Sequence, residues 1–169
     1  MEVHDVIPGK RILKTSLAVG ICLVISAIFQ LRGGFYMTIA SVLTMKATPE
    51  KSMDYGLSRT KGTMVGGVVG LILILLFQHF QIAVSSFAYI ILNMVGTIFC
   101  IWVAKIFRQS EASATSACVV LFTVTINRVA ESAVPLPYVL TRVVETLVGI
   151  FVAVIVNRFV GNKPMKIPS

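Results

Sequence analysis

Long apolar runs separated by short polar or turn-forming segments dominate this chain. A helix needs a stretch of about 20 apolar residues to cross the hydrocarbon core of a bilayer. The pattern predicts six membrane-spanning helices, and the second and fifth are short for a full crossing. The predicted spans are 12–31, 34–45, 62–79, 82–104, 112–127 and 136–160.

The polar segment 48–61 predicts a further helix, on the cytoplasmic side. Thr48 is a suitable N-cap, Pro49 suits the first helical position, and Glu50 follows in the first turn. No helix breaker separates this segment from the third span. We therefore expect a cytoplasmic helix that is continuous with that span or hinged to it.

The composition favours the membrane class. Of the 169 residues, 56% are hydrophobic and 13% are charged, whereas a soluble domain carries roughly 25% charged residues. A secretory signal is the alternative for the first run, which follows a basic start. The run is longer than a signal core and no small-residue cleavage site follows it, so we predict an all-α integral membrane protein forming a single domain, 1–169.

The basic residues are distributed unevenly between the predicted loops. With six spans and both termini in the cytoplasm, twelve of the 15 Lys and Arg residues lie inside, as the positive-inside rule requires. The net charge of +8 is then a topology signal and not a sign of nucleic acid binding. Three aromatic residues fall at span ends, as in an interfacial belt: Tyr36, Tyr138 and Trp102.

No pattern typical of catalysis or metal binding is visible. Cys22, Cys100 and Cys118 lie far apart in apolar runs, without metal-ligand spacing, and indicate small buried side chains. The sequence contains no Ser-His-Asp set, phosphate-binding loop or pair of catalytic carboxylates. We expect no enzyme activity, no cofactor and no metal.

Two parts of the sequence resemble each other and predict an inverted repeat. Each half contains three spans, so the second half is upside down relative to the first, as in transporters that bind substrate near the membrane midplane. Chance similarity between apolar segments is the alternative. The matching elements are Thr38-x-Ala40-Ser41 with Thr115-x-Ala117-Cys118, and Arg59-x-x-Gly62-Thr63-x-x-Gly66 with Arg142-x-x-Glu145-Thr146-x-x-Gly149.

The repeated arginines and threonines are candidate binding residues for an anion. Positions i, i+4 and i+7 share a helix face, and Arg offers a planar, permanently charged group to a carboxylate. Arg59 lies at the cytoplasmic edge and has a second interpretation, in which it only reaches the lipid headgroups. The predicted substrate-binding set is Arg142, Thr146, Arg59, Thr63, Lys46 and Lys61.

Glu145 and the glycines complete the set of candidates. Glu145 is an acid within a span, which indicates a proton-coupling group or, alternatively, a counter-ion of Arg142. The spacing of Gly62, Gly66 and Gly70 favours close helix packing, either within the chain or in a homodimer. Gly149 is the corresponding residue of the second half.

The sequence resembles the membrane domain of the fusaric acid resistance and aromatic acid exporter superfamily, often labelled FUSC. The segments that carry the resemblance include Arg59-x-x-Gly62-Thr63 and the closing stretch TRVVETLVGIFVAVIVNRFV. The resemblance implies a six-helix module that exports aromatic carboxylic acids, and it extends to dimeric plant malate channels that use basic residues. Most members carry a cytoplasmic domain after the last span, whereas this sequence ends soon after Val160.

Two functions are consistent with these patterns. The first is a transporter of a bacterial plasma membrane that exports small organic anions, with aromatic carboxylates as the expected substrates and a homodimer as the expected assembly. The second is a non-transporting membrane subunit that anchors or regulates a separate protein. A water-filled cavity around Arg142 would favour the first, and a sealed interior the second.

Overall fold

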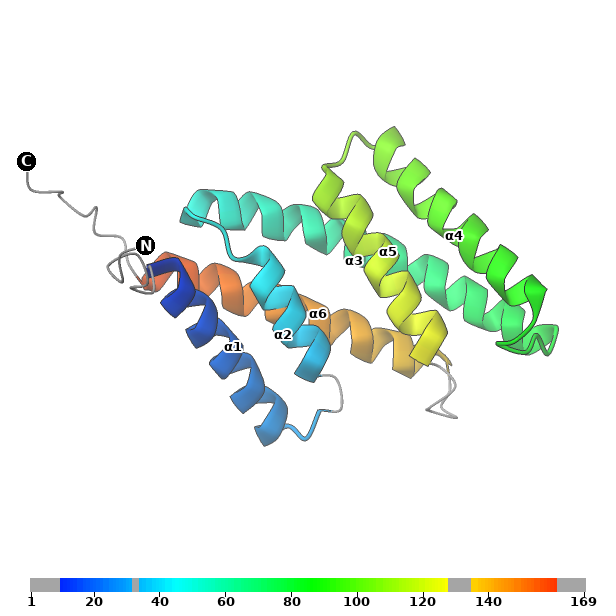
Figure 1. Cartoon of the computed structure of the whole chain (residues 1–169), viewed down its shortest axis with the longest axis horizontal. Coiled ribbons are helices and arrows are strands. Elements are labelled where there is room, and N and C mark those ends of the chain that lie inside the picture. The colour runs from blue at the N-terminus through cyan, green and yellow to red at the C-terminus, as the bar shows by residue number, and fades with distance from the viewer. Residues whose placement is uncertain (1–9, 32–33, 128–134, 161–169) are drawn as a thin grey trace, which may run out of the picture. The chain divides into compact units, whose positions relative to one another are not determined.

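The computed structural model describes residues 10–31, 34–127 and 135–160, which form six α-helices and no strand (Figure 1). The prediction of an all-α protein is confirmed for this part of the chain. The helices are α1 (Lys10–Ile28), α2 (Gly34–Thr44), α3 (Pro49–His79), α4 (Phe87–Ile106), α5 (Glu111–Asn127) and α6 (Pro135–Phe159).

The beginning of α3 follows from its capping residues. The Lys51 N–H donates to Thr48 Oγ1 at 3.3 Å, and the Ser52 N–H donates to the Thr48 carbonyl at 3.1 Å. Pro49 occupies the first helical position, where its missing N–H costs nothing. The helix then continues without a break to His79, so the segment 48–61 and the third predicted span belong to one element.

The beginning of α4 differs from the sequence prediction. The predicted span starts at 82, but the helix starts at Phe87. Ser86 is extended, with φ −77° and ψ 141°, and its Oγ accepts a hydrogen bond from the Ala88 N–H at 3.3 Å. Such a serine N-cap satisfies a backbone donor that the first turn leaves open. The apolar residues before it therefore belong to the connection.

Three helices are long and apolar enough to cross a membrane: α3, α4 and α6. The other three described helices contain shorter apolar stretches, Ile12–Ile28, Gly34–Thr44 and Glu111–Ile126. A 17-residue helix at 1.5 Å per residue spans about 26 Å, which is slightly less than a typical hydrocarbon core of about 30 Å. The helix lengths thus support full membrane crossings by α3, α4 and α6.

The chain divides into two compact units, and α3 and α6 each contribute to both. The first unit contains residues 1–56 and 148–169. Its helices α1 and α2 lie side by side and run in opposite directions (Figure 1). They pack on the second half of α6 in one apolar cluster, whose buried members from all these segments are Ala18, Cys22, Met37, Met45, Val152, Ala153 and Val156.

The second unit contains residues 57–147, and here α4 and α5 lie side by side (Figure 1). One apolar cluster joins α3, α4 and α5 through Val69, Cys100 and Leu121 among others. Another joins α3, α5 and α6 through residues that include Ile74, Val124 and Val139. This packing holds the polar residues of α3 and α6 that the sequence singled out.

Candidate anion-binding site

The two repeated arginines are both buried in the second unit. Arg59 is 2% exposed and Arg142 is 6% exposed. An arginine that reached lipid headgroups would have an exposed guanidinium, so the interfacial interpretation of Arg59 is wrong. Burying a charge is costly unless other groups compensate it. The groups that surround both cations are therefore candidate functional residues.

Arg142 has two partners on its own helix. Its Nη1 donates to Glu145 Oε2 at 2.9 Å, and Glu145 is itself only 2% exposed. The guanidinium also lies over the Tyr138 ring, with its carbon 5.0 Å from the ring centroid. Tyr138 is buried, one turn from Arg142, and is the cation–π partner of that residue.

The two predicted threonines differ in what their hydroxyls can do. Thr146 donates to the Arg142 carbonyl at 2.9 Å, so its proton is already used within α6. Thr63 is fully buried, and its Oγ1 has no hydrogen-bond partner among the described residues. A buried hydroxyl without a partner is costly. Thr63 is therefore the better candidate for a ligand contact.

The packing of α3 and α6 places these residues in order along the second unit. Gly67 faces Val143, while Ile74 clusters with Tyr138, so the two helices run antiparallel here. One turn away from this contact, Thr63 of α3 and Thr146 of α6 fall at about the same level. Arg59 lies one turn before Thr63, and Arg142 lies one turn before Thr146. Because the helices are antiparallel, these two turns lead in opposite directions. The two arginines thus flank the level of the threonines.

The glycines of α3 pack on α5 of the same chain. A Cβ added to Gly62 or Gly66 would collide with the carbonyl oxygens of Ser113 and Ala117, respectively. A Cβ on Gly70 would lie 3.0 Å from Val124 Cγ1. Residue numbers rise together on both helices, so α3 and α5 are parallel and nearly in backbone contact. Small residues at four-residue intervals permit this approach.

Gly149 makes a corresponding contact in the first unit. A Cβ at this position would collide with the Met37 carbonyl oxygen and lie 3.0 Å from the Ala40 Cβ. Helices α6 and α2 therefore approach as closely here as α3 and α5 do in the second unit. In both places the close approach depends on a glycine that ends an Arg-x-x-x-Thr-x-x-Gly segment.

Neither of the two predicted lysines is buried. Lys46 belongs to the first unit, where its Nζ lies 3.7 Å from the centre of the Tyr55 ring. Lys61 is exposed. Within the described ranges, no three His, Cys, Asp or Glu side chains are placed to hold a metal ion.

A buried polar cluster in the first unit was not predicted. Lys14 Nζ donates to Asn157 Oδ1 at 3.0 Å, and Asn157 Nδ2 lies within 3.1 Å of the Lys46 and Thr48 carbonyls and of Ser52 Oγ. Lys14 is only 8% exposed, so it is a structural cation and not merely a topology signal. The only sequence signal was a polar Asn157 at the end of an apolar run.

The family comparison agrees with this architecture. The model of the fusaric acid resistance protein-like family matches residues 17–156, which is most of the chain. No curated protein and no solved structure matches the chain. The matched range contains the buried arginines, Glu145 and the packing glycines, and the family is one of membrane transport and efflux. The chain is therefore a membrane protein that belongs to the fusaric acid resistance protein-like family.

Proposed function

We propose that this protein exports small organic carboxylates, with aromatic acids as the main class, across a bacterial plasma membrane. The observation that carries the proposal is the charge of the buried site. Among the described residues of the second unit, the buried charged side chains are Arg59, Arg142 and Glu145. Two cations and one anion give this group a formal charge of +1.

A net positive site in a membrane domain favours an anionic ligand. Arg is always protonated, so this charge cannot be removed by proton loss. A monocarboxylate would neutralise the group and accept hydrogen bonds from a guanidinium and from the Thr63 hydroxyl. The flanking positions of the arginines suit a small anion that enters between them. An apolar aromatic ring adds little desolvation cost to such a ligand.

In this proposal Glu145 competes with the substrate for Arg142. The Glu145 carboxylate already occupies Nη1 of that arginine, as a substrate carboxylate would. Protonation of Glu145 would weaken this ion pair and make Arg142 available to the anion. Anion binding and proton binding would then favour each other. This is the proton-coupling role of Glu145.

The two close helix contacts support a six-span inverted repeat as the frame of this site. Gly66 and Gly149 are equivalent in the repeated motif, and so are Ala117 and Ala40. Gly66 packs on Ala117 in the second unit, and Gly149 packs on Ala40 in the first. A chance sequence similarity would not be expected to produce equivalent contacts in both units.

The test is flux in proteoliposomes that contain equal amounts of folded protein. Arg142→Ala should weaken binding of an aromatic acid by about 2–4 kcal/mol, as expected for truncation of a buried charge pair, and Arg142→Lys should restore only part of it. Glu145→Gln should increase anion affinity and abolish its dependence on pH. Wild-type affinity in Arg142→Ala would refute the proposed site.

The burial of the site supports a second candidate, the non-transporting membrane subunit. Arg59, Thr63, Arg142, Glu145 and Thr146 are at most 8% exposed, as expected in a sealed, purely structural interior. A transporter with an occluded site would have the same burial. The panel of labelled aromatic and aliphatic acids, with and without a pH gradient, separates the two. Absence of flux for every acid would favour the subunit.

The assembly and orientation are also part of the proposal. We retain a homodimer with both termini in the cytoplasm. The glycines of α3 no longer argue for the dimer, because they pack on α5 of the same chain. The mass of the purified protein in detergent or nanodiscs measures the assembly directly.

A further inference from the structure

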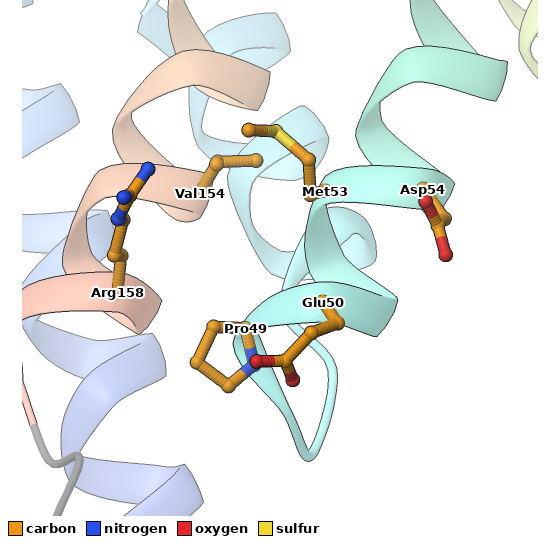
Figure 2. A pocket seen from close by; sticks show the side chains of 6 residues that line it. All are labelled: Pro49, Glu50, Met53, Asp54, Val154 and Arg158. Atoms are coloured by element: carbon orange, nitrogen blue, oxygen red, sulfur yellow. The ribbon is translucent and has the colours of Figure 1, made fainter.

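A cavity in the first unit shares no lining residue with the proposed anion site. It has a volume of about 450 Å³ and is lined by the start of α3 and the end of α6 (Figure 2). This volume is within the usual range for small-molecule sites, about 300–1,000 Å³. Its lining residues are Pro49, Glu50, Met53, Asp54, Val154 and Arg158.

The lining combines opposite charges with an apolar floor. Figure 2 shows Arg158 on α6 and Glu50 and Asp54 on α3, with Asp54 on the side away from Arg158, and with Met53 and Val154 between the two helices. Among the residues that the structure describes, none forms an ion pair or hydrogen bond with these three charged side chains. Both signs of charge are thus available to one ligand.

The cavity is continuous with an apolar strip on α6. Phe151, Val154, Ile155 and Arg158 share one face, by their spacing of three, four and seven positions. Phe151 is 64% exposed and Ile155 is 37% exposed. This strip runs from the cavity into the apolar part of α6, whereas Arg158 lies in its last turn. A ligand here would meet charges at the end of the helix and apolar surface beyond them.

We propose that this cavity binds a phospholipid whose headgroup carries a phosphate and a primary ammonium, as in phosphatidylethanolamine. The Arg158 guanidinium would hold the phosphate, since it matches phosphate geometry with two parallel hydrogen bonds. Glu50 and Asp54 would accept hydrogen bonds from the ammonium. The acyl chains would cover the strip at Phe151 and Ile155. This assignment is independent of the transport proposal.

The acidic pair decides between lipid classes. A trimethylammonium headgroup, as in phosphatidylcholine, carries the same charge but has no N–H to donate. A phosphatidylglycerol headgroup has no cation and places its charge beside two carboxylates. Phosphatidylethanolamine should therefore bind about three to five times more tightly than phosphatidylcholine with the same acyl chains, which is the magnitude of one net hydrogen bond.

The experiment is native mass spectrometry of the purified full chain, titrated with the three lipids. The Glu50→Gln/Asp54→Asn variant should lose the preference for phosphatidylethanolamine, and Arg158→Gln should weaken binding of all three. Glu111→Gln and Lys105→Gln are matched controls, because they remove an acid from the first turn of α5 and a cation from the last turn of α4. Both should bind lipids as the wild type does.

The same titration contains the results that would overturn the proposal. Equal affinity of the wild type for phosphatidylethanolamine and phosphatidylcholine would remove the role of the ammonium. A preference that survives in the Glu50/Asp54 variant would place the lipid elsewhere. Displacement of the lipid by an equal concentration of soluble phosphoethanolamine would show that the apolar strip contributes nothing, and the site would then belong to a soluble ligand.

Discussion

Replacing Gly66 with alanine tests the packing that holds the proposed site together. A new Cβ would collide with the Ala117 carbonyl oxygen and lie 2.8 Å from its Cα. Both are backbone atoms, so no side chain can rotate away, and the helices must separate. Overpacking of this kind costs about 1–3 kcal/mol. The unfavourable contact is thus larger than the gain in helix propensity from alanine.

Gly20 provides a matched control for that gain. It also lies within a helix, α1, but nothing lies within 4 Å of a Cβ added there. Gly20→Ala should therefore show only the propensity effect, a stabilisation of up to about 1 kcal/mol. The propensity gain is common to both variants, so the difference between them isolates the steric term, which we expect to be about 1–3 kcal/mol.

The assay is thermal unfolding of both variants in the same detergent, with circular dichroism to verify helix content. For a chain of this size, each kcal/mol shifts the unfolding temperature by about 2–4 °C. Gly66→Ala should therefore unfold about 2–12 °C below Gly20→Ala, by the same conversion. Equal unfolding temperatures would refute the close packing of α3 on α5. The oligomeric mass should not change, because both helices belong to one chain.

Two further predictions concern the first unit and the orientation of the chain. Asn157→Ala should destabilise the protein by about 1.5–3 kcal/mol in thermal unfolding, because it removes the side-chain acceptor of the buried Lys14 cation and leaves only the 3.5 Å bond to the Asn157 carbonyl, and Lys14→Met in the same chain should recover part of the loss. A reporter that works only in the cytoplasm should be active when it is fused after Ser169. Activity at this position of a reporter that works only outside the cell would refute the predicted orientation.

The helical class could be predicted from the sequence because it depends on local patterns. Apolar runs of sufficient length indicate helices regardless of their partners, and Thr48-Pro49 marked the beginning of α3 correctly. The start of α4 was less predictable. The residues before Ser86 are as apolar as those after it, and only the capping hydrogen bond to the Ala88 N–H separates loop from helix.

The packing partners were not predictable, for a physical reason. Glycines at four-residue intervals show that some backbone approaches closely, but they do not identify it, so α5 and a second subunit remained equivalent. Lys14 was treated as a topology signal because lysines near span ends usually reach water. It is buried because Asn157, far along the chain, supplies its hydrogen-bond acceptor. Long-range contacts of this kind leave no local signature.

The difference between the repeated motifs explains the net charge of the buried side chains in the proposed site. In the first motif the residue three positions after the arginine is Gly62, whose close contact with the Ser113 carbonyl leaves no room for a side chain. In the second motif the same position is Glu145, which pairs with Arg142. A strictly symmetric repeat would contain either two acids, and no net charge, or none, and a charge of +2. Because packing excludes the acid from only one motif, these buried side chains carry a single formal positive charge, which one carboxylate would neutralise in the proposed function.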